Sequence, residues 1–450
     1  MDRIMHKRFN RNYSAPGLVL AALALSLATS STLAADLDVP PAQNGWTGGY
    51  LGVAIGAGAS STDLNASLNL DDTPISAGLS GIGAEGLLWS AALGVDYQTS
   101  PRWVVGGMID YTGSSIASTL NFAVPPASGG YDLTADHSFS VLARAGYLSG
   151  PDTLIYLLGG YTWQNYSGAL SLTNVIDTGT QTTSYNFSLD GLTVGAGIEN
   201  RLGNGLSAKL EYRFTDFEDV GIIPGFLTAS PNSHTVRLGL NYKFGYDRGA
   251  VPDASAIAYN WTGFLVGIEA GAGINVTEFN VDAGGGNGGS FNGLSGEGGT
   301  LGVRVGYDHQ FNERWVGGLQ ASARLSNMNP EATLSVGGPP LTASIDEEYQ
   351  FALTARAGYL TTQDTMWYAL AGYQWSSIDF NVLGGSVGSV DRDGLVLGLG
   401  VETALTDSVT VGLEYRYVDY EDFDILGAGI ADAATSSHSA MVSLNYKFRP

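Results

Sequence analysis

The chain has 450 residues, of which 63 are glycine and none is cysteine, and its formal net charge is −23. The missing cysteines exclude disulfides and thiolate metal sites, and the acidic balance argues against nucleic acid as a partner, because phosphate binding needs Lys and Arg. Charged residues are only 14% and aromatic residues 10% of the chain, which fits neither an ordinary soluble domain nor a disordered segment.

The first 34 residues have the three parts of a secretory signal peptide. Basic residues lie between Arg3 and Arg11, residues 17–28 are apolar, and small residues precede an expected cleavage after Ala34. A membrane anchor helix is the alternative, but its apolar segment would be shorter than the roughly 20 residues that a span requires. Residues 35–45 then form an N-terminal segment. No later apolar stretch is long enough for a transmembrane helix, which leaves an exported soluble β-protein or a membrane β-barrel.

Eight segments of alternating polarity follow within residues 46–244. They lie at about 48–58, 87–98, 102–113, 137–148, 153–165, 190–202, 206–216 and 234–244. Each is close to the 9–11 residues that a tilted membrane strand needs. Short turns alternate with long connections rich in Gly, Ser, Asn and Thr, at about 59–86, 114–136, 166–189 and 217–233. This rhythm is typical of outer-membrane barrels, whereas a soluble β-sandwich has turns every 8–12 residues.

The same plan recurs in residues 261–448. Trp46-Thr-Gly matches Trp261-Thr-Gly, and Leu210-Glu-Tyr-Arg matches Leu413-Glu-Tyr-Arg. The period is too long for a solenoid unit, so the sequence indicates a duplicated domain. Residues 245–260 read as a linker that joins two closed eight-stranded barrels, and glycines on the inward faces suit such narrow barrels. The fold class is therefore all-β, with one sixteen-stranded barrel as the alternative.

The inward positions carry charged residues of both signs. Because unpaired buried charges are costly, we expect them to form ion pairs that plug each lumen and fix its register. The alternative is a polar filter for ions or small solutes. The candidate lumen charges are Asp96, Arg144, Glu199, Glu211, Arg213, Arg237, Arg304, Asp308, Arg356, Glu402, Glu414 and Arg416. An aromatic girdle at the membrane interfaces is expected from Trp46, Tyr97, Trp103, Tyr147, Trp163, Tyr212, Tyr242 and Phe244.

The last strand of each repeat ends in Tyr-x-Phe, after an apolar face that alternates with small or polar residues. Tyr242 and Phe244 close the first repeat, and Tyr446 and Phe448 close the second. This ending resembles the assembly signal of bacterial outer-membrane barrels, and its two copies suggest that one barrel ends near Phe244 and another near Phe448.

Two other sequence patterns have residue types that can carry chemistry. Ser233-His234 and Ser437-His438 raise the hypothesis of a lipid-modifying enzyme, but adjacent strand residues point to opposite faces. The acidic stretches 216–219 and 419–424 could hold a divalent cation, but a solvated surface is favoured. We therefore expect no catalytic residues, no metal site and no cofactor.

The motifs Trp46-Thr-Gly-Gly-Tyr-Leu-Gly and His234-Thr-Val-Arg-Leu-Gly-Leu-Asn-Tyr-Lys-Phe resemble the porin-like surface-antigen family of Gram-negative outer membranes. That family has eight-stranded barrels of the OmpA/OmpX type. The resemblance implies an outer-membrane protein with a structural, adhesive or weak pore role, and some members are linked to haemin binding. Its expected partners are outer-membrane lipids and lipopolysaccharide, the barrel-assembly machinery and an extracellular ligand of unknown identity. The tandem arrangement and the Arg449-Pro450 tail depart from the family pattern.

Overall fold

A computed structural model describes residues 45–70, 73–174, 179–244, 259–424 and 430–448. The expected signal peptide, nearly all of the N-terminal segment, most of the linker and the Arg449-Pro450 tail lie outside the described residues. In the part of the chain that is described, no helix is long and apolar enough to cross a membrane.

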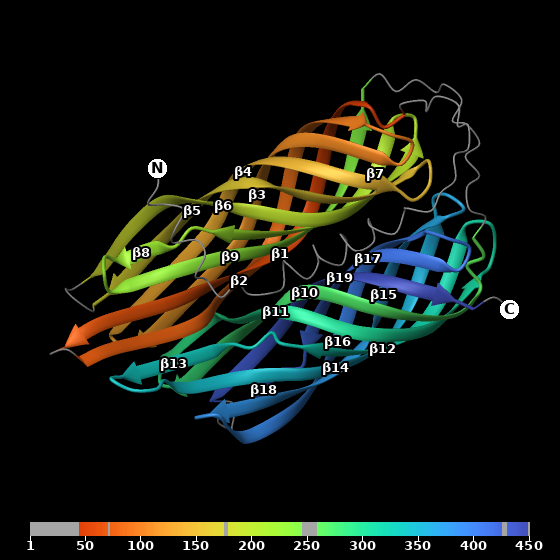
Figure 1. The fold of residues 1–450 in the computed structure, drawn as a ribbon. Helices are drawn as coiled ribbons and strands as arrows, with labels where there is room; N and C mark the ends of the chain where they lie inside the picture. The colour runs from red at the N-terminus through yellow and green to blue at the C-terminus, as the bar shows by residue number, and fades with distance from the viewer. Residues whose placement is uncertain (1–44, 71–72, 175–178, 245–258, 425–429, 449–450) are drawn as a thin grey trace.

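The strands of the first repeat form a closed antiparallel ring (Figure 1). Each of the long strands pairs with its neighbour in sequence, and β9 returns to pair with β1, where Leu51 lies opposite Tyr242. β8 is a short addition that pairs with β9. The strands are β1 (Gly48–Leu70), β2 (Thr73–Gln98), β3 (Trp103–Val124), β4 (Ala127–Leu148), β5 (Thr153–Thr173), β6 (Thr180–Gly203), β7 (Leu206–Phe217), β8 (Val220–Ile223) and β9 (Leu227–Lys243).

The second repeat closes in the same way. β19 pairs with β10, where Val266 lies opposite Tyr446, and the short strands β13 and β18 extend the ring. The strands are β10 (Gly263–Gly284), β11 (Asn287–Gln310), β12 (Trp315–Ser326), β13 (Glu331–Val336), β14 (Leu341–Leu360), β15 (Thr365–Val382), β16 (Gly385–Ala404), β17 (Val409–Tyr420), β18 (Phe423–Asp424) and β19 (Ala431–Lys447). The prediction of two tandem eight-stranded barrels is therefore confirmed. Both edges of each sheet are used within its own repeat, which leaves no open edge for lipid.

Most strands are much longer than the sequence predicted. β2 has 26 residues and β6 has 24, and the expected long connections form hairpin extensions of the same strands. Backbone N–H and C=O groups must be paired wherever the chain is ordered, so Gly-, Ser- and Thr-rich segments continue the ladder beyond the membrane. Register shifts mark the change, for example between Gly113 and Ile116 and between Ala135 and His137.

The extensions of the two barrels exchange partners at their outer end. The β2 residues that precede Glu85 no longer pair with β3. Residues 75–79 pair instead with β13, where Gly78 lies opposite Thr333. β3 pairs instead with β11, where Leu120 lies opposite Phe291. The walls of both barrels therefore join into one ring-shaped sheet at this end. The single-ring alternative thus describes the outer extensions, whereas the lower halves of the strands close into two separate barrels.

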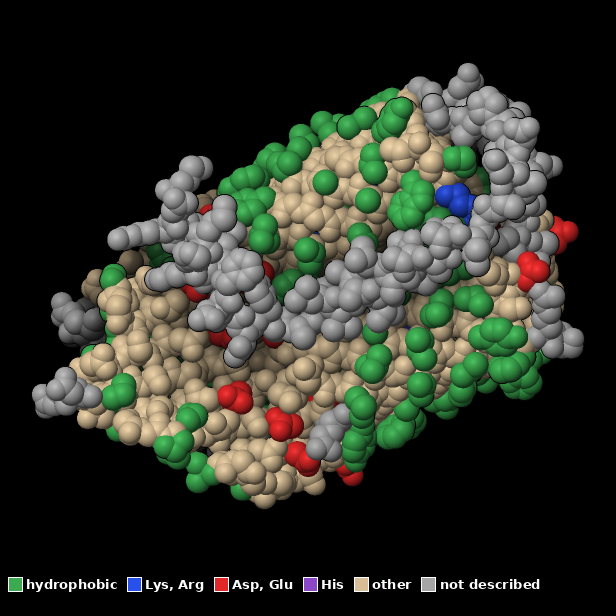
Figure 2. Space-filling model, viewed as in Figure 1, with side chains coloured by type: hydrophobic (Ala, Val, Ile, Leu, Met, Phe, Trp, Pro, Cys, Tyr) green, Lys and Arg blue, Asp and Glu red, His purple; other side chains and the backbone are tan. Residues whose placement is uncertain are grey.

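Side chains alternate between the two faces of the wall in the way that a membrane barrel requires. Leu51, Val53 and Ile55 are 43%, 55% and 67% exposed, whereas Tyr50 and Ala54, which point to the opposite face of the same strand, are buried. Figure 2 shows hydrophobic side chains spread over the outer surface of both barrels. This outward apolar face and inward polar face are the pattern of strands that cross a bilayer.

The two barrels lie side by side and share an apolar contact (Figure 1). It joins outward side chains of β6, β7 and β9 to outward side chains of β10, β16, β17 and β19. Its buried members are Ile198, Leu210, Tyr212, Phe214, Val236, Ala272, Val401, Val411, Leu413, Ala440 and Val442. Tyr212 is only 3% exposed, so its expected place in the lipid-facing girdle is wrong: the second barrel covers it.

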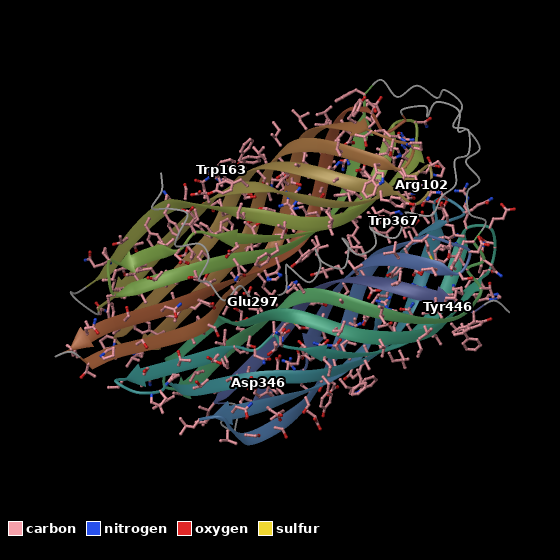
Figure 3. All side chains as sticks on the ribbon, in the orientation of Figure 1. Arg102, Trp163, Glu297, Asp346, Trp367 and Tyr446 are labelled. Atoms are coloured by element: carbon pink, nitrogen blue, oxygen red, sulfur yellow. The ribbon has the colours of Figure 1, made fainter. Side chains whose placement is uncertain are left out.

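Polar contacts at the two sides of this interface are reciprocal. His234 contacts Glu297 of the other repeat at 3.2 Å, and His438 contacts Glu85 at 2.8 Å. Figure 3 places Glu297 between the barrels. Burial alone would raise the pKa of the Glu85 carboxyl, but hydrogen bonds from His438 and Ser436 outweigh it and hold that pKa below its ordinary value. His234 and His438 are equivalent residues of the two repeats, and so are Glu85 and Glu297. Each histidine contacts the glutamate of the other repeat, as in a two-fold symmetric dimer.

A disulfide test follows from the contact between Ser61 and Ser295, whose hydroxyl oxygens are 2.8 Å apart across the two repeats. The chain has no cysteine, so Ser61→Cys with Ser295→Cys should form one new disulfide that links the barrels. Its formation is measured by the change in unreduced gel mobility of the folded protein. The mismatched pair Ser61→Cys with Thr365→Cys should stay reduced. Equal oxidation of both pairs would contradict the side-by-side arrangement.

Candidate functional site

A charged layer crosses the lower lumen of each barrel. In the first, the Arg144 guanidinium lies 2.6 Å from the nearer Asp96 oxygen and 2.8 Å from Glu199. Lys243 also contacts Asp96, at 3.2 Å. All of these side chains are buried, so each charge is removed from water and compensated by its partners.

The second barrel repeats this layer. Arg356 contacts Asp308 and Glu402, each at 2.7 Å, and Lys447 contacts Asp308 at 2.9 Å. The same three kinds of contact therefore occupy matching strands of both repeats. This layer is the part of the lumen in which the two repeats are alike.

Glycines make room for the aromatic rings that flank the layer. The Arg144 guanidinium lies 4.8 Å from the centre of the Tyr50 ring and 5.1 Å from that of Tyr156. A Cβ at Gly94 would overlap the Tyr50 ring, and one at Gly197 would overlap Tyr156. The inward glycines are therefore the reason why a narrow barrel can hold both the rings and the ion pairs.

A second layer lies above the first and differs between the barrels. In the first barrel, Arg213 contacts Asp110 at 2.5 Å and Glu211 at 2.7 Å. Arg237 shares Asp110 at 3.5 Å, and Lys209 shares Glu211 at 3.4 Å.

In the second barrel, Arg416 contacts Glu414 at 2.5 Å, as its counterpart does in the first. Arg304 and Arg324 both bind Glu269, and Arg304 reaches Glu414 at 3.5 Å. The pair on β17 therefore matches the pair on β7, and the additional charges of this layer come from β10, β11 and β12.

All twelve candidate lumen charges lie inside the barrels and contact a partner of opposite sign. Whether they act as a structural plug or as a filter stays a prediction. The sequence reasoning missed Lys209, which follows from simple alternation with Glu211. It also missed the Glu347–Arg392 pair, at 2.6 Å, and a register shift between Glu347 and Tyr349 hides that pair from any alternation argument.

Each lumen is closed at its lower mouth by a tryptophan. Trp46 is 2% exposed, its indole N–H donates to the Pro151 carbonyl at 3.0 Å, and the Lys243 ammonium lies 5.5 Å from its ring centre. Trp261 binds the Gln363 carbonyl in the same way, at 3.1 Å. The expectation that Trp46 belongs to the lipid-facing girdle is therefore wrong. The reason is that it precedes the first strand and folds back under the barrel.

The upper mouth differs between the barrels. In the first, Tyr166 stacks on Phe187 with ring centres 5.1 Å apart and meets Phe217 edge-on at 6.4 Å. In the second, the same level holds the Glu347–Arg392 ion pair. One lumen therefore opens under an aromatic cluster and the other under a charged pair.

The serine–histidine pairs do not form a catalytic arrangement in the described residues. Ser233 lines the lumen of the first barrel, whereas His234 points outward, where its Nδ1 contacts the Tyr212 hydroxyl at 2.8 Å. His438 has the equivalent contact with Tyr415, at 2.7 Å. Among the described residues, no group of three or more acidic, histidine or cysteine side chains could hold a metal ion.

The aromatic ends of the closing strands face outward. Tyr242 and Phe244 are about half exposed and meet edge-on at 5.9 Å, and Tyr446 and Phe448 do so at 5.2 Å. Tyr446 points away from the second barrel in Figure 3. This exposed pair is the geometry expected of an assembly signal, and its role stays a prediction.

Arg144→Met tests the energetic role of the lower layer. The change removes the common partner of Asp96 and Glu199 and leaves buried carboxylates with less compensation, so the free energy of unfolding should fall by about 3–5 kcal/mol. The measurement is urea unfolding in detergent, and Arg356→Met should behave alike. Arg102→Met is the control: its guanidinium contacts Tyr147 on the exposed outer surface, and its loss should cost less than about 1 kcal/mol. An Arg144→Met barrel of unchanged stability would contradict the plug.

Comparison with known proteins agrees with this geometry. A family model described as "Outer membrane protein beta-barrel domain" matches the chain twice, at residues 20–244 and 249–448. The 31 kDa outer-membrane immunogenic protein of Brucella melitensis is 30% identical over 240 residues, which are 50% of this chain and 99% of that protein. The 22 kDa outer membrane protein of Rhizobium leguminosarum is 32% identical over 120 residues, which are 26% of this chain and 52% of that protein.

Solved structures show only weak similarity to this chain. The attachment invasion locus protein Ail of Yersinia pestis covers 44% of this chain and 99% of its own, with 16% identity and a TM-score of 0.23. A FadL homologue of Pseudomonas aeruginosa covers 89% of this chain and 91% of its own, with 10% identity and a TM-score of 0.25. The two family matches span nearly the whole sequence. The chain therefore belongs to the outer membrane protein beta-barrel domain family and is a bacterial outer-membrane protein with that domain in tandem.

Proposed function

We propose that this protein is a non-enzymatic component of the outer-membrane surface, and that its outer strand extensions, rather than its lumens, carry its function. The observation that carries this proposal is the filling of both lumens. Buried ion pairs cross each barrel at two levels, and a tryptophan closes each lower mouth. Small eight-stranded barrels have interiors just wide enough for side chains, which suits a plug better than a channel.

The extensions supply a surface for contact. β2, β13, β11 and β3 join the walls of the two barrels into one sheet beyond the membrane, which is more rigid than separate loops would be. A relative that this chain covers over nearly its full length is named an immunogenic protein, which fits a role at the cell surface.

The charge of this wall indicates the kind of partner. The four outer segments of the first repeat, 59–86, 114–136, 166–189 and 217–233, contain no Lys or Arg, but they contain several Asp and Glu residues. The corresponding part of the second repeat carries exposed carboxylates at Asp282, Asp391 and Asp432, and its Arg392 is bound to Glu347. An acidic surface of this kind favours a cationic partner, such as a lysine-rich peptide or protein segment.

A conductance measurement separates this proposal from the alternative of a small-solute pore. The full-length protein in planar bilayers should show no steady opening, because the buried ion pairs and the tryptophan plugs block both lumens. A wide porin in the same bilayers serves as the positive control. Reproducible single-channel openings of the wild-type protein would favour the pore and would count against a purely surface role.

A binding measurement tests the partner class directly. Full-length protein in nanodiscs should bind an oligolysine peptide, and raising salt from about 15 to 150 mM should weaken binding because exposed charges are screened. Replacing Asp282, Asp391 and Asp432 by Asn should weaken it further. Glu313→Gln, in a turn at the opposite end of the second barrel, is the matched control and should have no effect. Equal binding of an oligoglutamate peptide would overturn the cationic partner.

A further inference from the structure

A small cavity lies in the first barrel, between its second charged layer and its aromatic upper mouth. Its volume is about 40 Å³. One water-sized particle needs roughly 10–15 Å³ on this measure, so the cavity has room for about three. It is too small for a sugar, a nucleotide or an aromatic compound. A single small inorganic ion with one or two waters fits its size.

The lining of the cavity is rich in hydrogen-bond donors. Arg213 and Arg237 lie at its charged side, and Tyr166 and Phe217 lie at its apolar side. Between them, hydroxyl-bearing side chains form most of the wall: Ser60, Thr112, Ser114, Ser138, Ser140, Thr162, Thr215, Ser233 and Thr235. Arginines and hydroxyls can all donate to an anion, whereas no carboxylate is among the lining residues.

Arg237 is not fully satisfied by the protein. Its side chain is buried, with 5% exposed, and one Nη donates to the Thr112 hydroxyl at 2.9 Å. Its Nε has no hydrogen-bond partner within the described residues. A buried guanidinium donor without an acceptor is costly, which points to a missing acceptor in the cavity that this side chain lines.

The charges around the cavity point to the sign of that acceptor. Lys209, Arg213 and Arg237 are compensated in this layer by only two carboxylates, Asp110 and Glu211. Arg237 has the longest of these ion-pair contacts, because its Nη lies 3.5 Å from Asp110 Oδ1. The other oxygen of this carboxylate, Oδ2, contacts Arg213 at 2.5 Å. A water could accept a hydrogen bond from Nε, whereas an anion there would also offset the excess positive charge of this layer.

The second barrel supplies an internal comparison. Counting along the two closing strands from His234 and His438, Met441 occupies the position of Arg237. Met441 is fully buried, and the second barrel gathers its upper charges around Glu269 instead. The unpaired Nε of Arg237 and the hydroxyl-lined cavity therefore have no counterpart at Met441, although the upper layer of the second barrel has the same balance of three cations and two carboxylates.

We propose that the first barrel holds a small inorganic anion of about the size of chloride, bound by Arg237 and the surrounding hydroxyls. The anion completes the charge balance of the second layer and seals the lumen beneath the aromatic cluster of Tyr166 and Phe217. This site is independent of the acidic outer wall, so it stands or falls separately from the proposed surface role.

Bromide provides a direct test, because it replaces chloride and scatters anomalously. Crystals of the full-length protein grown or soaked in sodium bromide should show an anomalous peak within hydrogen-bond distance of Arg237 Nε. The equivalent position beside Met441 should show none. Absence of a peak at Arg237, or a peak of equal height beside Met441, would overturn the proposal.

A stability measurement tests the same site in solution. At constant ionic strength, replacing gluconate by chloride should raise the thermal midpoint of the detergent-solubilised wild-type protein by a few degrees, and the effect should saturate. Arg237→Met, which introduces the residue found in the second barrel, should fold and lose this dependence. Asp110→Asn, which removes a competing carboxylate, should strengthen it. A wild-type midpoint that does not respond to chloride, or an Arg237→Met variant that keeps the full response, would overturn the proposal.

Discussion

The structure depends on one constraint: in hydrocarbon, every backbone N–H and C=O group must be paired within the protein. Each repeat meets it by returning its last strand to its first, so that Leu51 pairs with Tyr242 and Val266 with Tyr446. Once the rings are closed, side chains can only point into lipid or into a narrow lumen. The apolar outer face, the inward glycines and the buried ion pairs all follow from this division.

The narrow lumen then determines how charge is handled. Desolvation of Arg144, Asp96 and Glu199 is offset only because the contacts are close and Tyr50 and Tyr156 flank the guanidinium. Glycine at positions 94 and 197 supplies the space for these rings. The ion pairs, the aromatic rings and the glycines therefore form one packing unit, and a similar unit with Tyr368 beside Arg356 recurs in the second repeat.

Alternation of polarity was enough to predict the fold class, the two closed barrels and the inward place of the lumen charges, because a period of two is fixed by the strand itself. It failed where the chain departs from that period. A register shift beside Tyr349 turns Glu347 inward. The Gly, Ser and Thr residues of the long polar connections have low hydrophobic contrast, so alternation does not reveal that these connections are strands. Contacts between the repeats could not be predicted from alternation either. Tyr212 occupies an outward strand position, as a lipid-facing tyrosine does, so its sequence neighbours do not reveal that the second barrel covers it.

The interface between the barrels is where duplication changes the molecule. Outward side chains such as Leu210, Tyr212 and Val236 satisfy the rule for a lipid-facing strand, yet the second barrel covers them. In lipid, an apolar side chain gains little from leaving the bilayer, so close packing and polar contacts must supply the specificity of such an association. The reciprocal His234–Glu297 and His438–Glu85 contacts provide polar contacts of this kind at both sides of the interface. Above them, the exchange of strand partners between β2, β3, β11 and β13 adds backbone hydrogen bonds, which do not depend on side-chain identity. Because the two domains are joined in one chain, they form these contacts without meeting by diffusion, while their lumens differ at positions such as Arg237 and Met441.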